Sequence, residues 1–357
     1  MSEAKNALIS RIILIRNRTS KDVAHRIISR NGIPHSWLSQ VPTSRRTGEG
    51  KLRDERGILV LTDRSSPFIE QFKHPKGKCY PFYKLTAYNN CNYWCEYCYL
   101  YLTFYMRPQS MHFVNYDKLF EEMERFDSRN INPKFKVLNL GELADPIAVD
   151  EVTGFSKTLI DYNSNLDDTR LMLLTKGDYV ENLLDADHKG KVIVSWSVNS
   201  DYIADLFEHR VPSVDTRIAA AKEVENAGYE VRFRIDPIFK YDGWERGYEE
   251  LVDKIFDNLA PKMITLGEYR PSQNLITHIR KRFPNSKLLE LDRKLKMEAG
   301  KKRYDFRTRV QLYSHIIRVI RKRNRKVRIA LCKETIKVWN ACGLDHRGMC
   351  CNCTNIT

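Results

Sequence analysis

Long apolar runs are missing from this chain of 357 residues. No stretch reaches the roughly 18 residues needed to span a bilayer. The first residues include the charged Glu3 and Lys5 in place of the apolar core of a secretory signal. Internal repeats and low-complexity tracts are also missing. Because a hydrophobic content of 42% is enough for a large core, we expect a globular, cytoplasmic protein.

Acidic residues are fewer than basic ones. The chain has 45 Asp and Glu against 60 Lys and Arg, a formal net charge of +15. Such an excess can serve solubility alone, but it favours a nucleic-acid partner, because Lys and Arg that displace phosphate counterions give strong, salt-dependent binding. The basic residues gather at 294–309 and 318–328, with another cluster that includes Arg45, Arg46, Arg53 and Arg56.

Cysteines, by contrast, are plentiful. Cys91, Cys95 and Cys98 follow a C-x3-C-x2-C pattern. Three thiolates from one loop can bind three irons of a cubane [4Fe-4S] cluster and leave the fourth iron open to an amine and a carboxylate of a small molecule. Zinc usually requires four ligands and C-x2-C pairs, and no second pair follows at zinc-finger spacing. The pattern predicts an iron-sulfur cluster.

Strand-like and helix-like segments alternate from about Phe82 onward, which predicts βαβ units and a parallel sheet. In such folds, functional groups gather at the carboxyl ends of the strands. Before Phe82 we expect a strand within 8–15, a helix at 22–29 and a strand at 57–61. After it we expect strands at 137–140, 171–174, 192–194, 231–235 and 263–266, and helices at 116–126 and 216–227.

The cysteine motif and several later blocks resemble the spore photoproduct lyase family of the radical S-adenosylmethionine (SAM) superfamily. The similarity extends from about Phe82 to about Tyr304. The blocks are Cys95-Glu96-Tyr97-Cys98-Tyr99-Leu100, Leu174-Thr175-Lys176, the run from Ser195 to Tyr202, Asp236-Pro237-Ile238 and Gly243-Trp244-Glu245.

The resemblance implies an α/β fold, a partial (β/α)6 radical-SAM barrel with an N-terminal extension and a Cys-rich C-terminal tail. We expect boundaries at 1–80, 81–290 and 291–357. The implied activity is reductive cleavage of SAM at a [4Fe-4S] cluster, followed by hydrogen abstraction from a nucleic-acid base. That base would be a damaged or modified thymine in DNA, and a flavodoxin or ferredoxin would supply the electron.

Roles for single residues also follow from the resemblance. Lys176 would bind the SAM carboxylate, and Glu142 the ammonium group. Ser197 and Asp236 would face the cofactor from strand ends, and Tyr97 would flank the adenine. Arg303 and Tyr304 would contact the substrate, since interleaved Arg and aromatic residues suit stacking on bases and phosphate contact.

Gly141 departs from the family, whose best-known members place a cysteine in this block to return a hydrogen atom to the product. Tyr99 could pass a hydrogen atom onward, but such a relay needs a thiol. The tail supplies Cys332, Cys342, Cys350, Cys351 and Cys353. They could hold a second iron-sulfur cluster, hold zinc, or act as free hydrogen donors, and we expect turnover to require them. Cys79 stands alone, and we expect it to be structural.

Two other functions fit the sequence. A radical SAM enzyme of this kind could act on RNA, a small metabolite or a peptide instead of DNA. A non-catalytic, zinc-dependent nucleic-acid-binding protein would use the same cysteines structurally, and iron and sulfide analysis separates it from the enzymes.

Overall fold

An eight-stranded sheet forms the centre of the protein, in the order β15-β12-β11-β10-β9-β8-β5-β4. The computed structural model describes residues 8–43, 48–72, 79, 81–345 and 351–355. Six consecutive strands of this sheet follow chain order and pair in parallel, which confirms the predicted (β/α)6 order. They are β5 (Phe82–Leu85), β8 (Val137–Leu140), β9 (Arg170–Thr175), β10 (Val192–Val198), β11 (Glu230–Ile238) and β12 (Met263–Glu268).

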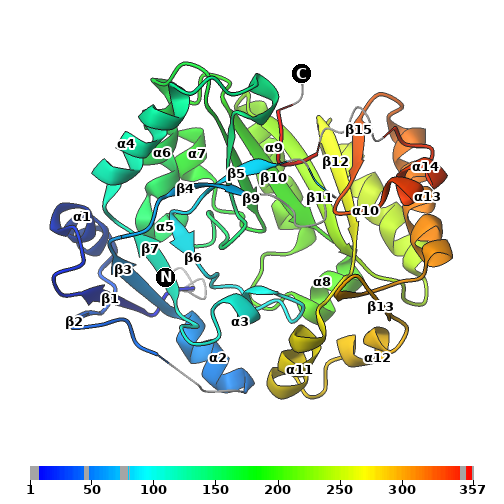
Figure 1. Ribbon diagram of the computed structural model, residues 1–357, viewed down its shortest axis with the longest axis horizontal. Helices are drawn as coiled ribbons and strands as arrows, with labels where there is room; N and C mark the ends of the chain where they lie inside the picture. The colour runs from blue at the N-terminus through cyan, green and yellow to red at the C-terminus, as the bar shows by residue number, and fades with distance from the viewer. Residues whose placement is uncertain (1–7, 44–47, 73–78, 80, 346–350, 356–357) are drawn as a thin grey trace, which may run out of the picture.

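Helices cover the outer face of this sheet (Figure 1). Alternate residues of a strand face opposite sides. Thus Val194 and Trp196 of β10 are fully buried in the main core, whereas the Ser195 hydroxyl makes a polar contact on the inner side. The connecting helices are α3 (Leu100–Thr103), α4 (Tyr116–Asp127), η1 (Pro133–Phe135), α5 (Asp150–Thr153), α6 (Phe155–Ser164), α7 (Glu181–Leu184), α8 (Asp201–Phe207), α9 (Val214–Asn226) and α10 (Trp244–Asn258).

The N-terminal residues form a second sheet beside the first. Its order is β2-β1-β3-β7-β6, and it combines early strands with strands from beyond residue 81. The early chain also supplies β4 (Ile69–Phe72), which pairs antiparallel with β5. Both sheets therefore combine strands from the two sides of the expected boundary at residue 80. The others are β1 (Arg11–Ile15), α1 (Lys21–Asn31), β2 (His35–Leu38), α2 (Glu49–Arg56), β3 (Ile58–Thr62), β6 (Tyr88–Asn89) and β7 (Ser110–Phe113).

The C-terminal region also adds to the main sheet, because β15 (Arg328–Leu331) pairs in parallel with β12. The basic run at 318–328 covers the last turns of α13 and the connection to β15, and most of its cationic side chains are exposed. The remaining elements are α11 (Gln273–Arg282), α12 (Leu288–Asp292), β13 (Lys296–Glu298), β14 (Lys301–Arg303), α13 (Phe306–Arg323) and α14 (Ile336–Ala341).

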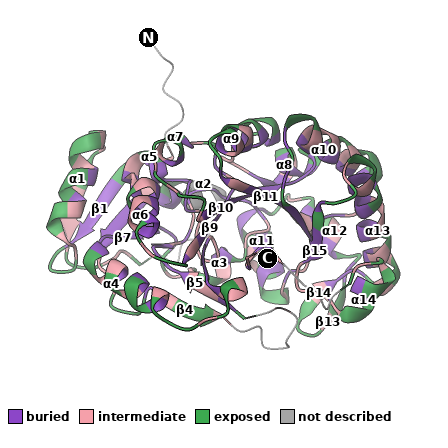
Figure 2. Ribbon diagram, turned by 90° about the horizontal axis from the view of Figure 1, so that it is seen from above, coloured by how far each residue is buried: buried purple, intermediate pink, exposed green. Residues whose placement is uncertain are grey.

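The end of the chain returns to the inner face of the main sheet. Buried Arg232 of β11 donates to the carbonyls of Asn352 (3.0 Å) and Thr354 (2.7 Å), and Ser195 of β10 donates to the Asn352 side chain (3.0 Å). Asn352 and Thr354 are themselves buried, although helices α13 and α14 nearby keep exposed outer faces (Figure 2). No helix in the described ranges is both long enough and apolar enough to cross a membrane.

Candidate active site

Cys91, Cys95 and Cys98 lie in the loop between β6 and α3, and all three are free thiols. Burial raises the pKa of Cys91 to about 12, so a metal is needed to hold it as a thiolate near neutral pH. Within the described part of the chain, no three His, Cys, Asp or Glu side chains are arranged around one metal ion. Thiolates that each bind a different iron need not converge on one point, so the three cysteines of the loop fit a cubane cluster.

Arginine side chains support this loop from beneath. Arg56 is 1% exposed and donates to the carbonyls of Cys91 and Tyr93. The guanidinium groups of Arg56 and Arg282 lie 5.0 and 4.6 Å from the centre of the Tyr101 ring. Both cations favour negative charge on the cysteine loop. The sequence analysis grouped Arg56 with a basic cluster near the start of the chain, and the structure shows that its side chain is buried. Of that cluster, Arg45, Arg46 and the Arg53 side chain lie outside the described residues.

Two of the predicted cofactor-binding residues, Tyr97 and Lys176, meet at Glu208, which follows α8 and which the sequence analysis missed. Lys176 Nζ lies 2.7 Å from Glu208 Oε1 and 3.0 Å from Ser197 Oγ, and the Tyr97 hydroxyl donates to the same carboxylate. Arg217 Nη2 donates to Glu208 Oε2 at 2.6 Å. Burial would raise the pKa of Glu208, but the charges of Arg217 and Lys176 outweigh it and hold the pKa at about 2.

Asp145 fixes the backbone beside Lys176. Its carboxylate accepts from the Thr175 hydroxyl and the Lys176 amide, both at 2.7 Å, and from the amides of Ile147 and Ala148. Asp145 therefore fixes the backbone of Lys176, and Glu208 fixes its ammonium group. An ammonium carries three donors, and one remains for a ligand carboxylate after Ser197 and Glu208.

Asp236 lies at the end of β11 between two arginines. Arg234 and Arg270 donate to it at 2.7 and 3.0 Å. Burial raises the pKa of Asp236, but Arg270 and Arg234 outweigh this and hold it well below the usual range. Both arginines also reach Cys332 Sγ, at 3.1 and 3.4 Å. The predicted contact of Asp236 with SAM stays a prediction.

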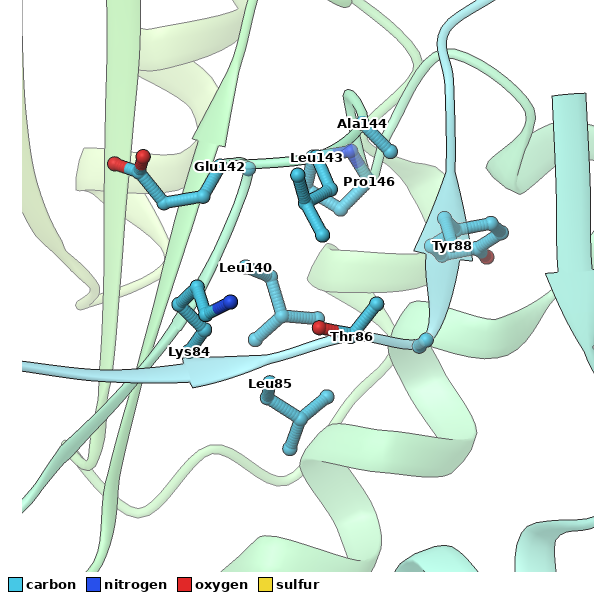
Figure 3. A pocket seen from close by; sticks show the side chains of 11 residues that line it. Lys84, Leu85, Thr86, Tyr88, Leu140, Glu142, Leu143, Ala144 and Pro146 are labelled. Atoms are coloured by element: carbon cyan, nitrogen blue, oxygen red, sulfur yellow. The ribbon is translucent and has the colours of Figure 1, made fainter. Parts of the chain in front are cut away.

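Glu142 and Gly141 follow β8, where the chain turns above the inner face. Figure 3 shows the Glu142 carboxylate directed away from Leu143 and Pro146, and the Tyr99 hydroxyl donates to the Glu142 carbonyl. Gly141 has a φ of +125°, and a Cβ there would lie 2.7 Å from Leu174 Cβ and 2.8 Å from the Leu174 carbonyl oxygen. This backbone leaves no room for a side chain at position 141.

The predicted substrate residues are buried. Arg303 is 3% exposed and pairs with Glu268 and Glu334, and the Tyr304 hydroxyl accepts from the Lys240 amide at 3.0 Å. Burial, outweighing the neighbouring arginines, raises the pKa of Glu268 to about 7. These positions favour a structural role, and substrate contact by Arg303 and Tyr304 stays a prediction.

The tail cysteines divide into two groups. Cys332, Cys351 and Cys353 line a cavity on the inner face that also contains Cys79, so Cys79 does not stand alone as expected. Cys342 ends α14, where its sulfur lies 3.8 Å from the Ser314 hydroxyl of α13. Cys350 lies outside the described residues.

Comparisons with known proteins agree with this site. The family model described as spore photoproduct lyase matches residues 14–330. Curated spore photoproduct lyases of Geobacillus sp. (strain Y412MC61) and Bacillus subtilis (strain 168) are 31% and 30% identical to this chain. The first alignment covers 71% of this chain and 74% of the relative, and the second covers 67% and 70%.

Solved structures agree as well. A spore photoproduct lyase complexed with dinucleoside spore photoproduct has a TM-score of 0.80 at 25% identity, covering 92% of this chain and all of the other. A double mutant of spore photoproduct lyase with bound AdoMet and dinucleoside spore photoproduct has a TM-score of 0.78 at 25% identity, covering 90% of this chain and 98% of the other.

Proposed function

This chain belongs to the spore photoproduct lyase family of radical SAM enzymes, and we propose that it repairs spore photoproduct, a thymine lesion, in DNA. The observation that carries the proposal is that Tyr97 of the cysteine loop and Lys176 both contact Glu208, and that Lys176 also donates to Ser197. A cofactor that chelates iron through an amino-acid group requires an iron-binding loop and, beside it, an ammonium group such as that of Lys176 to bind its carboxylate.

The residues of the loop fit a [4Fe-4S] cluster, which when bound with SAM supplies the radical that abstracts hydrogen from the substrate. Cys91, Cys95 and Cys98 would hold the irons. Lys176 would hold the SAM carboxylate and Glu142 the ammonium group, with Ser197 and Tyr97 completing the pocket. Tyr99, beside Cys98, would relay a hydrogen atom.

The electron would come from a flavodoxin or ferredoxin in a reducing cytoplasm. The net charge of +15 suits an acidic partner as well as DNA. Zinc in the tail has little support, since no group of three or more ligand side chains in the described ranges is arranged for one metal ion. A second cluster in the tail stays a prediction. The guanidinium groups of Arg234 and Arg270 at Cys332 would also repel a metal cation.

The reconstituted protein should convert dinucleoside spore photoproduct into two thymidine units under anaerobic conditions, with SAM and a reductant. Product would be followed by chromatography, with omission of SAM as the control. Cleavage of SAM without any repair of the photoproduct would contradict the proposal and point to RNA, a metabolite or a peptide as substrate.

Replacing Lys176 by alanine should weaken SAM binding at least ~10-fold, because a charge-assisted contact worth about 1.5–3 kcal/mol is lost. The absorption of the cluster should not change, since no iron ligand is removed. Equilibrium binding of SAM to the reconstituted protein measures the effect. The matched control is Lys157→Ala, an exposed lysine of α6 that pairs with Asp161. Equal affinity in the Lys176 variant and the wild type would show that Lys176 only balances the charge of Glu208.

A further inference from the structure

We propose that Cys353, brought to the inner face of the sheet by the returning C-terminal tail, is the thiol that donates a hydrogen atom to the substrate radical. This inference rests on the proposed function and assigns one residue to a step of that reaction. Cys351 carries the neighbouring sulfur, and the two thiols share a hydrogen bond.

Buried hydrogen bonds hold the tail against the inner face of the main sheet. Arg232 holds the carbonyls of Asn352 and Thr354 from below. Asn139 of β8 donates to the Cys353 carbonyl at 3.2 Å. Gly141 follows Asn139 by two residues, just past the end of β8. The hydrogen bond from Asn139 therefore holds the Cys353 carbonyl beside the strand that leads to Gly141.

The tail cysteines line a cavity that reaches up to the candidate site. Glu142, whose carbonyl accepts from Tyr99, lines this cavity together with Cys351 and Cys353. Thr265 Oγ1 and Trp339 Nε1 are buried, belong to residues that line the same cavity, and have no hydrogen-bond partner among the described residues. Unpartnered buried polar atoms are costly, so they suit a cavity that receives a polar ligand such as a base.

Chemistry selects a thiol from the groups in this cavity. The S–H bond is weaker than the O–H and C–H bonds of the other side chains, so a carbon radical removes hydrogen from sulfur first. The product C–H bond forms as the Cys353 S–H bond breaks homolytically. The odd electron moves to sulfur, and the step consumes no outside oxidant or reductant.

Of the two tail sulfurs, Cys353 is the one that keeps its hydrogen. The hydrogen bond with Cys353, together with the charges of Arg232 and Arg234, outweighs burial and lowers the pKa of Cys351 to about 7. The same bond and burial raise the pKa of Cys353 well above its usual value. A thiol, not a thiolate, carries the atom to be transferred.

Position 141 carries no thiol and has no space for one, so the hydrogen donor must come from elsewhere in the chain. A cysteine at 141 would place its Cβ within 2.8 Å of the Leu174 backbone. Among the described residues, the thiols that line this cavity are those of Cys79, Cys332, Cys351 and Cys353. Of these, Cys353 is the one whose backbone is held by β8, the strand that leads to Gly141.

The test is repair of dinucleoside spore photoproduct in D2O by the full-length reconstituted enzyme. Thiol hydrogens exchange with solvent, so the wild type should place one deuterium per repaired photoproduct, in one of the two thymidine units, as measured by mass spectrometry. Cys353→Ser should lose this label and at least ~10-fold of product per 5′-deoxyadenosine formed, about 1.4 kcal/mol or more. Cys351→Ser and Cys342→Ser should keep the label, because neither residue is the donor.

Each outcome decides the question. A wild type that cleaves SAM but repairs nothing overturns the proposed function and this inference with it. Full labelling in Cys353→Ser, or loss of the label in Cys351→Ser alone, overturns the inference and leaves the function intact. An unchanged cluster spectrum and circular dichroism of Cys353→Ser show that it has folded, and Gly141→Cys in the Cys353→Ser background should not restore the label.

Discussion

Replacing Cys95 by alanine is expected to abolish reductive cleavage of SAM, and the same result is expected for Cys91→Ala and Cys98→Ala. Each thiolate would hold one iron, so the loss of any one leaves too few ligands for the cubane. Iron should fall from about four atoms per chain to well below that number, and the broad absorption near ~400 nm should disappear. Iron and sulfide analysis and chromatography of 5′-deoxyadenosine measure these changes after anaerobic reconstitution.

The matched control is Cys342→Ala, which removes a free thiol that lies between α13 and α14. Its iron content and SAM cleavage should equal those of the wild type. If any of the three loop variants still cleaves SAM at the wild-type rate, that cysteine is not an iron ligand. Zinc without iron in the wild type would restore the non-catalytic alternative.

The fold could be predicted from the sequence where local pattern decides the structure. The strand expected at 137–140 matches β8, and the helix expected at 116–126 differs from α4 by one residue. The expected strand at 8–15 begins only at Arg11. Alternation of apolar residues in buried parallel strands is a short-range signal, so these elements appear in one sequence without any knowledge of their partners.

Long-range contacts could not be predicted in the same way. Nothing in the run Cys351-Asn352-Cys353-Thr354 indicates that Arg232, 120 residues earlier, will bind its carbonyls. Likewise, Glu208 reads as an ordinary residue at a helix end, although Lys176, Tyr97 and Arg217 all meet there. A buried carboxylate is identified by its partners in space, and spacing along the chain carries no such signal.

Replacing Glu208 by glutamine should lower the free energy of unfolding of the apoprotein by about 3 kcal/mol near neutral pH. The amide keeps the shape of the side chain but removes the negative charge that Arg217 and Lys176 share. Arg217 is 1% exposed and would then be a buried cation without a counter-charge. Urea unfolding followed by circular dichroism measures the difference. An exposed pair serves as the matched control: Glu250→Gln removes the partner of Arg246 on α10 and should change stability by less than ~0.5 kcal/mol.

The difference between wild type and Glu208→Gln should also depend on pH, in a direction fixed by the pKa. The pKa of Glu208 lies at about 2 in the folded protein, below its ordinary value of 4.5. A depressed carboxyl pKa contributes stability above 4.5 and loses it as the pH falls toward 2, so the gap of about 3 kcal/mol should shrink in acid. Other carboxylates are present in both proteins and cancel in the difference. A gap that stays constant from about pH 7 to about pH 3 would mean that the pKa of Glu208 is the same in the folded and unfolded protein, and that Arg217 and Lys176 do not stabilise its charge.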